Sequence, residues 1–530
     1  MEQRAETGLQ SSRRAFVVGA GALAAASALS AASAFAEEGG HALWEPAWDA
    51  EADVVVVGFG AAGAAAAYAA SQAGAEVIVL EKFDEDFAGG DSCVNLGFVG
   101  AVSDDWRQYV AHSGGTASPE KAQQLCDAAH RAVEWVAGMP GLVYKQGAVE
   151  GGAPAFYAGV SAYVAGLPGV RVSYETPACG LVRNPDTGDV VGVRAAALSG
   201  EVTVKARRGV VLATGDYASS PELLSQFHYP NLPIANVGGP GDTGDGLRMA
   251  ASVGAQLGHL TNTSLDWAGA AFRKPSEELG CAFYYNYGGL MEPDDPLPAK
   301  IVVNRVGERF MNEETLLAGM QHNRNDADHA FLDVYSEGHS ASGDYVNMPM
   351  FMVVDAKGFG TAPLLVNEGK GWRCKKGVYA WSEDNQVELE RGWVLKADSL
   401  EELADLMAST TCMKGEDVTV DAAGLARTVE AYNEGCAVGE DAFGRTAFAA
   451  LDTPPYYAVE LMPCLVYLEG GPVVDEGQRV MDWFDQPVGR LYAAGNVCMG
   501  GELMPFYLSG AMGMGLDAGA GAASLEDWGA

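Results

Sequence analysis

The stretch that decides the fold is residues 53–82, DVVVVGFGAAGAAAAYAASQAGAEVIVLEK. It begins with a β-branched run, Val54 to Val57, which is typical of a buried parallel strand. A GxGxxG turn follows, and then an alanine-rich helix and a second apolar strand that ends at Glu81. This order predicts a βαβ unit that binds a dinucleotide, and a glycine turn in an ordinary βαβ unit is the alternative.

Each part of the unit has an expected task. Gly58 allows the tight turn, Gly60 lets the backbone approach a pyrophosphate, and Gly63 lets the helix pack close to the sheet. The N-terminus of the helix offers N–H groups and a partial positive charge to that anion. Glu81 lies 23 residues after Gly58, where an acid is expected to hold a ribose hydroxyl. The cofactor-binding residues predicted here are Gly58, Gly60, Ala61, Ala62, Gly63, Glu81 and Lys82.

The N-terminal residues carry an export pattern. Residues 12–16, SRRAF, form a twin-arginine pattern, and an alanine-rich run follows as far as residues 34–36, AFA. A basic segment, a mildly apolar run and an A-x-A site predict a twin-arginine signal peptide over residues 1–36, with a membrane anchor as the alternative. The mature protein is expected to lie outside the cytoplasm, in the periplasm or at the cell surface, without a membrane span.

Composition narrows the classes of partner. The chain has 33 basic and 70 acidic residues, a net charge of −37, so nucleic acid and anionic membranes are poor partners. The 48% hydrophobic content is ample for the cores of two or three domains. The nine cysteines are dispersed and form no CxxC or CxxCH motif. The sequence therefore shows no zinc knuckle, iron–sulfur run or attached haem.

Further along the chain, two strands are predicted to end in turns of small residues, which let the backbone touch a cofactor. Residues 207–212, RRGVVL, lead into 213–217, ATGDY, and residues 490–493, RLYA, lead into 494–496, AGN. Between them, residues 243–250, TGDGLRMA, open a helix. Residues 509–523 are rich in glycine and alanine and predict a tightly packed final helix that approaches the cofactor closely.

Taken together, these pieces resemble the superfamily of FAD-dependent fumarate reductases and 3-ketosteroid dehydrogenases. The resemblance covers nearly the whole expected mature chain and depends on the order of the motifs. Besides the segments above, it includes residues 89–92, GGDS, residues 304–313, NRVGERFMNE, and residues 431–436, AYNEGC. Asp216 is a departure, because the family usually has a second glycine there.

The resemblance implies an α/β fold in which a Rossmann-like FAD-binding domain is interrupted by an α+β capping domain. After the signal peptide and a linker over residues 37–50, the FAD-binding domain spans residues 51–258 and 452–530, and the capping domain spans residues 259–451. Non-covalent FAD is implied, with the substrate between the cap and the flavin. The further residues assigned to FAD are Gly89, Gly90, Asp91, Ser92, Thr214, Gly215, Asp245, Gly495, Asn496, Ser509 and Gly510.

The substrate site departs from the fumarate-type pattern. Leu317 stands where such members have an arginine proton donor, and Tyr467 and Tyr507 stand where they have a histidine and an arginine that clamp carboxylates. A buried dicarboxylate needs paired cations, so fumarate or succinate is not the expected substrate. A tyrosine before the final helix resembles the 3-ketosteroid dehydrogenase branch. Tyr507 and Tyr467 are therefore the candidate catalytic residues for a neutral unsaturated carbonyl compound.

An aromatic run, residues 283–287 (FYYNY), adds Tyr284, Tyr285 and Tyr287 as candidate substrate-binding residues. The alternative is a strand that packs its aromatic side chains into the core of the cap.

The expected reaction is reduction of an activated C=C bond, in an enone, lactone or aryl-conjugated alkene, by hydride transfer from flavin N5. A tyrosine would polarise the carbonyl or donate the proton. Electrons would come from a separate c-type cytochrome or a quinol-linked donor. Desaturation of a ketone is one alternative, and a fumarate-like reduction of a small carboxylate that uses Arg273, Lys274 or Arg305 is another. A non-enzymatic flavoprotein is the third.

Overall fold

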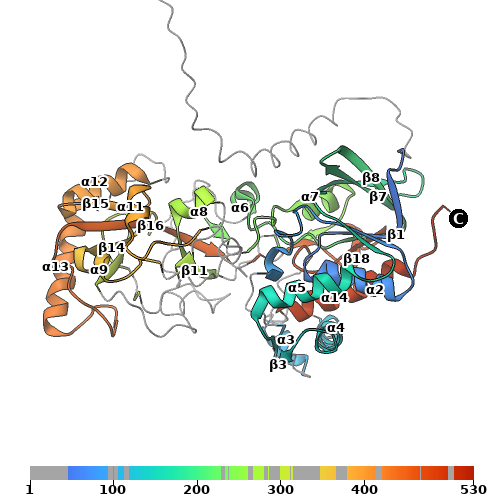
Figure 1. Ribbon diagram of the computed structural model, residues 1–530, viewed down its shortest axis with the longest axis horizontal. Coiled ribbons are helices and arrows are strands. Elements are labelled where there is room, and N and C mark those ends of the chain that lie inside the picture. Colours follow the sequence, from blue (N-terminus) through green and yellow to red (C-terminus); the bar gives the residue numbers. More distant parts are fainter. Residues whose placement is uncertain are drawn as a thin grey trace, which may run out of the picture. The chain divides into compact units, whose positions relative to one another are not determined.

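The computed structural model (Figure 1) describes most of the chain from Pro46 onward. The described residues are 46–93, 99–100, 105–112, 118–227, 233–236, 238–260, 267–279, 284–285, 299–310, 312–313, 347–365, 379–411, 420–465, 467–468, 470–498 and 507–529. The predicted signal peptide and most of the predicted linker lie outside them. Among the described helices, none combines the length and apolarity needed to cross a bilayer.

The first sheet is mostly parallel and has the strand order β18-β19-β8-β1-β2-β5, with β7 also beside β8 and β6 beside β7. The four pairings from β19 to β5 are parallel, and those of β18, β6 and β7 are antiparallel. The strands are β1 Ala50–Val57, β2 Val77–Leu80, β5 Val170–Ser173, β6 Ala178–Arg183, β7 Val190–Ala197, β8 Gly200–Leu212, β18 Arg479–Met481 and β19 Pro487–Ala493. The predicted βαβ unit and the α/β fold class are thus confirmed, and β19 brings the end of the chain next to β8.

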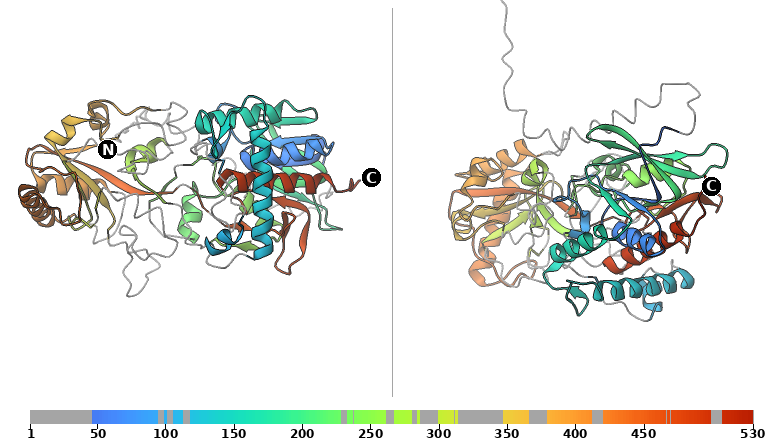
Figure 2. Two further views of the ribbon diagram at one scale, coloured as in Figure 1. Left: turned by 90° about the horizontal axis from the view of Figure 1, so that it is seen from below. Right: turned by 45° about the vertical axis from the view of Figure 1, so that its right-hand side comes forward.

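Small residues let the helices of this sheet pack closely. The final helix α14 (Tyr507–Ala523) packs against α2 (Ala61–Gln72) and α4 (Pro119–Ala137). A Cβ added at Gly515 would lie 2.2 Å from the Ala62 carbonyl oxygen, and one at Gly519 would lie 2.1 Å from the Ala66 oxygen. These glycines therefore serve contact with α2, whereas the sequence suggested a close approach to the cofactor. Figure 2 shows α14 and α2 side by side.

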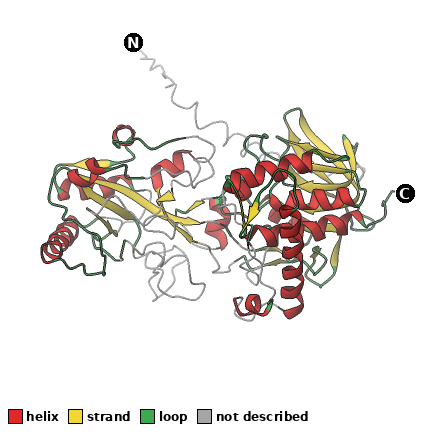
Figure 3. Cartoon of the chain, turned by 60° about the horizontal axis from the view of Figure 1, so that its bottom comes forward, coloured by secondary structure: helices red, strands yellow, loops and turns green. Residues whose placement is uncertain are grey.

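A second sheet has the order β12-β11-β16-β14-β13, with β9 and β15 also paired to β16. Its strands are β9 Ala235–Asn236, β11 Trp267–Phe272, β12 Tyr284–Tyr285, β13 Lys300–Val303, β14 Met350–Asp355, β15 Leu395–Ala397 and β16 Tyr456–Leu465. Successive residues of β14 join different cores: Met350 and Met352 lie in one apolar cluster, and Phe351 and Val353 lie in the other. Because both faces are covered, this sheet is the centre of a layered unit (Figure 3).

The pairing of β16 corrects one predicted boundary. The sequence placed residues 452–530 in the second part of the FAD-binding domain, but β16 is central to the second sheet. Its apolar residues alternate between the two cores, with Val459 in one and Ala458 in the other. β10 (Leu257–Gly258), ahead of β11, pairs with β17 (Gly471–Pro472), which follows β16. This pairing places the return to the first sheet after Leu465.

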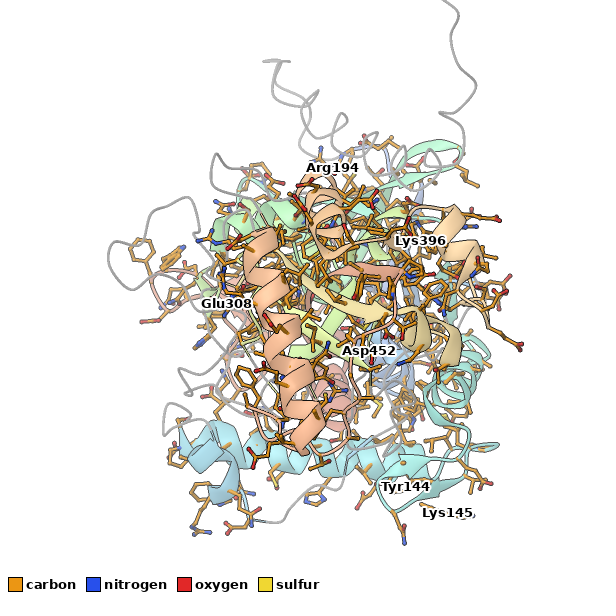
Figure 4. All side chains as sticks on the ribbon, turned by 90° about the vertical axis from the view of Figure 1, so that its left-hand side faces the viewer. Tyr144, Lys145, Arg194, Glu308, Lys396 and Asp452 are labelled. Carbon is orange, nitrogen blue, oxygen red and sulfur yellow. The ribbon has the colours of Figure 1, made fainter. Side chains whose placement is uncertain are left out.

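The remaining elements are shorter connections and surface helices. They are η1 Gly90–Cys93, α3 Arg107–His112, β3 Tyr144–Lys145, β4 Ala148–Val149, α5 Gly152–Ala165, α6 Pro221–Phe227, α7 Asp245–Ser252, α8 Arg273–Leu279, α9 Ala356–Thr361, α11 Gln386–Glu390, α12 Leu400–Thr410 and α13 Ala422–Val438. Figure 4 views the molecule from the side of the second sheet and labels Lys396 on β15 and Asp452 before β16.

Candidate active site

Glycine turns follow the carboxyl ends of β1, β8 and β19 and lie close together. Gly58, Gly215 and Gly495 all have a positive φ, at +98°, +74° and +79°. A Cβ at Gly58 would lie 2.3 Å from the Ala213 oxygen, and one at Gly495 would lie 2.8 Å from the Ala62 Cβ. These turns therefore cannot accept a side chain without movement. Ligands of open α/β sheets bind at this end of the strands.

The start of α2 is built to receive an anion. Its N-cap is Gly60, which has no side chain to cap the helix, and the first turn contains no acidic residue. The Ala61 N–H donates to Ser92 Oγ at 2.8 Å, whereas the N–H groups of a first turn have no partner within their own helix. A Cβ at Gly60 would lie 3.4 Å from Ser92 Oγ and 3.8 Å from the Gly89 oxygen, at ordinary contact distance, so Gly60 is not crowded by the protein. A pyrophosphate suits such a helix start.

Glu81 is placed where the sequence expected it, at the end of β2. Its carboxylate is 6% exposed and accepts the N–H groups of Phe59 at 2.9 Å and Phe83 at 3.0 Å. Burial raises the pKa of this carboxyl group, and the two backbone N–H groups act against that rise. Glu81 thereby holds the glycine turn to the end of β2.

Lys82 and Asp245, both assigned to FAD from the sequence, are brought together. Lys82 Nζ lies 2.8 Å from Asp245 Oδ2 and donates to Thr243 Oγ1 at 3.0 Å. Asp245 begins α7, so this pair joins the end of β2 to the start of that helix. Thr214, in the turn after β8, has a buried Oγ1 with no hydrogen-bond partner among the described residues. This hydroxyl is available to a cofactor atom.

The loop at residues 89–92 contributes to a buried group of three carboxyl side chains. Asp91 accepts the Gly239 N–H at 2.8 Å and hydrogen-bonds to Asp242. Asn496 Nδ2 lies 3.4 Å from Asp91 Oδ2 and also bonds Asp216. Gly89 and Gly90 both have a positive φ, and a Cβ at Gly89 would lie 2.8 Å from the Tyr157 ring. The residues predicted from GGDS, ATGDY and AAGN are thus in one place.

The three carboxyl groups cannot all be ionised at neutral pH. Burial and the charge of Asp91 raise the pKa of Asp216 to about 8. Burial also raises the pKa of Asp91, and burial together with Asp91 and Asp216 raises that of Asp242 well above its usual range. Like charges in a shared buried site disfavour each other's ionisation, so the group retains protons at pH 7. Sequence reasoning missed Asp242, because nothing in its local sequence distinguishes it from a turn residue.

Of the tyrosines predicted to contact the substrate, only Tyr467 has its side chain in the described part of the structure. Tyr467 is half-buried and directly precedes Leu468, whose N–H is held by Asp216. Tyr507 begins α14, and Tyr284 and Tyr285 form β12, but their side chains lie outside the described part. Tyr287 lies outside it entirely. Ser509 and Gly510, which were assigned to FAD, are buried in the first turn of α14, and the Ser509 N–H donates to the Val99 oxygen at 3.0 Å.

Arg273 and Lys274, two of the basic residues predicted for an alternative carboxylate site, already have partners in or beside the second sheet. Arg273 is 4% exposed and pairs with Glu460 and Glu277, both at 2.6 Å. Lys274 donates to the Gly392 oxygen at 2.8 Å. No lysine, arginine or histidine follows Arg490 in the sequence, and none lies between Tyr457 and Gln478. The segments around Tyr467 and Tyr507 therefore carry no cation of their own.

Comparison with known proteins gives two family matches. Residues 147–513 match the model of a FAD binding domain, and residues 53–155 match that of a FAD dependent oxidoreductase. Vinyl phenol reductase of Lactiplantibacillus plantarum is 26% identical over 84% of this chain and 90% of its own. Digoxin reductase of Eggerthella lenta is 26% identical over 97% and 95%.

A solved structure shares the fold. The 3-ketosteroid delta1-dehydrogenase of Sterolibacterium denitrificans superposes with a TM-score of 0.62 at 20% identity, over 89% of this chain and 99% of that chain. The predicted FAD and the predicted oxidoreductase class are confirmed by the family matches. The glycine turns, the glycine N-cap of α2 and the Thr214 hydroxyl, which has no hydrogen-bond partner among the described residues, fit this cofactor.

Proposed function

We propose that this chain, which belongs to the FAD binding domain family that its residues 147–513 match, reduces a neutral, activated carbon–carbon double bond. The expected substrate is an enone, a lactone or an aryl-conjugated alkene. The proposal extends to this chain a type of chemistry that the names of its relatives imply for those proteins, a vinyl phenol reductase and a digoxin reductase.

The observation that carries the proposal is the position of the Tyr467–Leu468 segment. The Leu468 N–H donates to Asp216 at 2.7 Å, and Asp216 directly follows the Thr214–Gly215 turn assigned to FAD. A tyrosine is therefore held next to the cofactor turn of β8, in a segment without cations. A buried carboxylate substrate without a paired cation is very costly, whereas a carbonyl oxygen needs only a hydrogen-bond donor.

The residues of the chain would have separate roles in binding FAD and in binding the substrate. FAD, when bound, supplies hydride transfer to carbon. Gly58, Gly60 and the start of α2 would hold its pyrophosphate, and the Thr214 hydroxyl would donate to it. Tyr507 would donate a hydrogen bond to the substrate carbonyl or a proton to the α-carbon, and Tyr467 would present its ring and hydroxyl. A phenol has an ordinary pKa of about 10, so a proton relay would have to support Tyr507.

An anaerobic dye assay tests the reaction. The FAD-loaded full chain would be mixed with reduced methyl viologen, and dye oxidation would be followed with a neutral cyclic enone, fumarate or an aryl acrylate. Oxidation by the enone alone supports the proposal. Oxidation by fumarate or the acrylate would show that cations reach the substrate from elsewhere. If only a saturated ketone with an oxidising dye reacts, the enzyme works in the desaturating direction.

A matched pair of variants tests the tyrosine. Tyr507→Phe removes one phenol and is expected to lower kcat by about a hundredfold, the lower range for a general acid. Tyr144→Phe removes a phenol that donates to the Gly100 oxygen at 3.1 Å, on β3, and is expected to leave kcat unchanged. Equal rates for the two variants would exclude a proton-donating role for Tyr507.

The physiological electron donor and the site of action are part of the same proposal. A separate c-type cytochrome or a quinol-linked system would supply the electrons, and the twin-arginine pattern in residues 12–16 would direct export. Fractionation of cells that express the full chain tests export, because a cytoplasmic, uncleaved protein would contradict it.

A further inference from the structure

Asp216 joins the turn after β8 to the segment after β16. It is 2% exposed, and its Oδ1 accepts the Ala218 N–H at 2.7 Å. Its Oδ2 accepts the Leu468 N–H, also at 2.7 Å, from a residue 252 positions away in the sequence. One carboxyl group therefore fixes the segment that carries Tyr467 to the turn that contains Thr214 and Gly215.

The next residue makes a parallel connection. Tyr217 is fully buried, and its hydroxyl donates to the Leu260 oxygen at 2.9 Å. Leu260 lies just after β10, and Leu468 lies just before β17, the strand that pairs with β10. Asp216 and Tyr217 thus hold the segment ahead of β11 and the segment after β16.

The carboxyl group has a specific energetic task. Leu468 is fully buried, so its N–H has no access to water if the acceptor is removed. A buried donor left unsatisfied is costly. A glycine, the residue expected at position 216 from the resemblance, could not accept this bond. The contact is therefore a feature of this chain's own sequence.

We propose that Asp216 is a positioning residue for the reaction, whose carboxyl group fixes the Tyr467–Leu468 segment to the turn after β8 and so sets the place of Tyr467 at the flavin site. The role of Tyr467 rests on the proposed function, but the hold on Leu468 does not. The groups that face Asp216 are Asp91, Tyr217 and Asn496, with Asp242 beyond Asp91.

The ionisation of Asp216 adds a pH dependence. Its pKa is raised to about 8, mainly by burial. The carboxylate that forms above this pH accepts hydrogen bonds more strongly than the protonated acid does. The hold on Leu468 is therefore expected to tighten as the pH rises through about 8.

Hydrogen exchange on the FAD-loaded full chain tests the hold without any substrate. In Asp216→Gly, peptides that contain the Leu468 amide are expected to exchange about ten- to a hundredfold faster than in wild type. Asp216→Asn keeps a neutral acceptor, so it is expected to exchange as wild type does below about pH 8 and faster than wild type above it. Asp482→Asn is the matched control, because Asp482 accepts two backbone N–H groups in the exposed turn between β18 and β19. Unchanged exchange in Asp216→Gly, or an equal change in Asp482→Asn, would overturn the proposal.

The dye assay then tests the consequence for the reaction. Asp216→Gly is expected to lower kcat/KM for the enone by about tenfold, as a misplaced group does, and Asp216→Asn is expected to lose the wild-type pH dependence near 8. Faster exchange with unaltered kinetics would overturn the positioning role. Faster exchange with no turnover of any alkene, even by wild type, would refute the proposed function and leave the hold on Leu468 intact. If Asp216→Gly does not fold, a wild-type pH profile in Asp216→Asn overturns the proposal.

Discussion

Gly63→Ala tests how closely α2 must approach the strand before it. A Cβ at this position would lie 2.0 Å from the Gly58 oxygen and 3.0 Å from the Gly58 carbonyl carbon. Ordinary contact begins at 3.4 Å, so the helix would have to move by 3.4 − 2.0 = 1.4 Å. Both neighbours are backbone atoms, so no change of side-chain rotamer can relieve the clash. Overpacking of this kind costs about 1–3 kcal/mol.

The same movement would displace the N–H groups that are expected to hold the pyrophosphate. Gly63→Ala is expected to weaken FAD binding by about 1.4 kcal/mol, which raises the Kd of FAD tenfold. Titration of apoprotein with FAD, followed by flavin fluorescence, measures this Kd, and thermal melting measures stability.

Gly360→Ala is the control for Gly63→Ala. Gly360 lies in α9, has no atom within 4 Å of its ideal Cβ, and is expected to gain about 0.5–1 kcal/mol as alanine. If Gly63→Ala bound FAD and melted as wild type does, the close approach at the start of α2 would be refuted.

Three further outcomes are expected. Folding raises the pKa of Asp216, so the unfolded chain releases this proton more readily, and the melting temperature should fall as the pH rises from about 4 to about 8. Asp216→Asn should flatten this slope. An identical slope in the variant would contradict the raised pKa of Asp216. Arg273→Met should destabilise the fold around the second sheet by about 3–5 kcal/mol, because it leaves Glu460 buried without its partner. The preference for a neutral enone over fumarate should stay the same in the dye assay. Gly515→Ala should lower the melting temperature, because its Cβ would lie 2.2 Å from the Ala62 oxygen; an unchanged melting curve would mean that α14 can move away from α2.

The sequence was sufficient for the first sheet because the relevant signals are local. Val54 to Val57, the glycine turn and Glu81 lie within one βαβ unit, so their spacing alone predicts their contacts. The strand ahead of Gly495 could also be predicted, because a hydrophobic run that ends in small residues is typical of a strand that leads into a tight turn. The turns that carry Gly58, Thr214, Gly215 and Asn496 therefore lie at the same end of the first sheet, and their role in holding FAD stays a prediction.

Long-range pairings were beyond the same reasoning. β16 is an apolar strand that suits either sheet, and only its pairing with β11 and β14 shows which one it joins. Asp216 was noticed as a departure from glycine, but its partner Leu468 is 252 residues away, and no local pattern connects them. The sequence predicted a tightly packed final helix with a close approach to the cofactor, but Gly515 and Gly519 of α14 lie against α2, near the other end of the chain.

The ribbon formed by β10 and β17 has a consequence for how this enzyme can change. Leu257 is opposite Pro472 and Gly258 is opposite Gly471, so every strand of the second sheet except β9 lies between two points that are neighbours in space. Such an insertion can be exchanged as a cassette while the strand order of the first sheet is kept. An exchange would also have to preserve the pairing of β9 with β16 and the contacts of α6, whose Leu223 and Leu224 pack into a core of the second sheet. The inserted strands can therefore diverge in sequence while the first sheet keeps its fold.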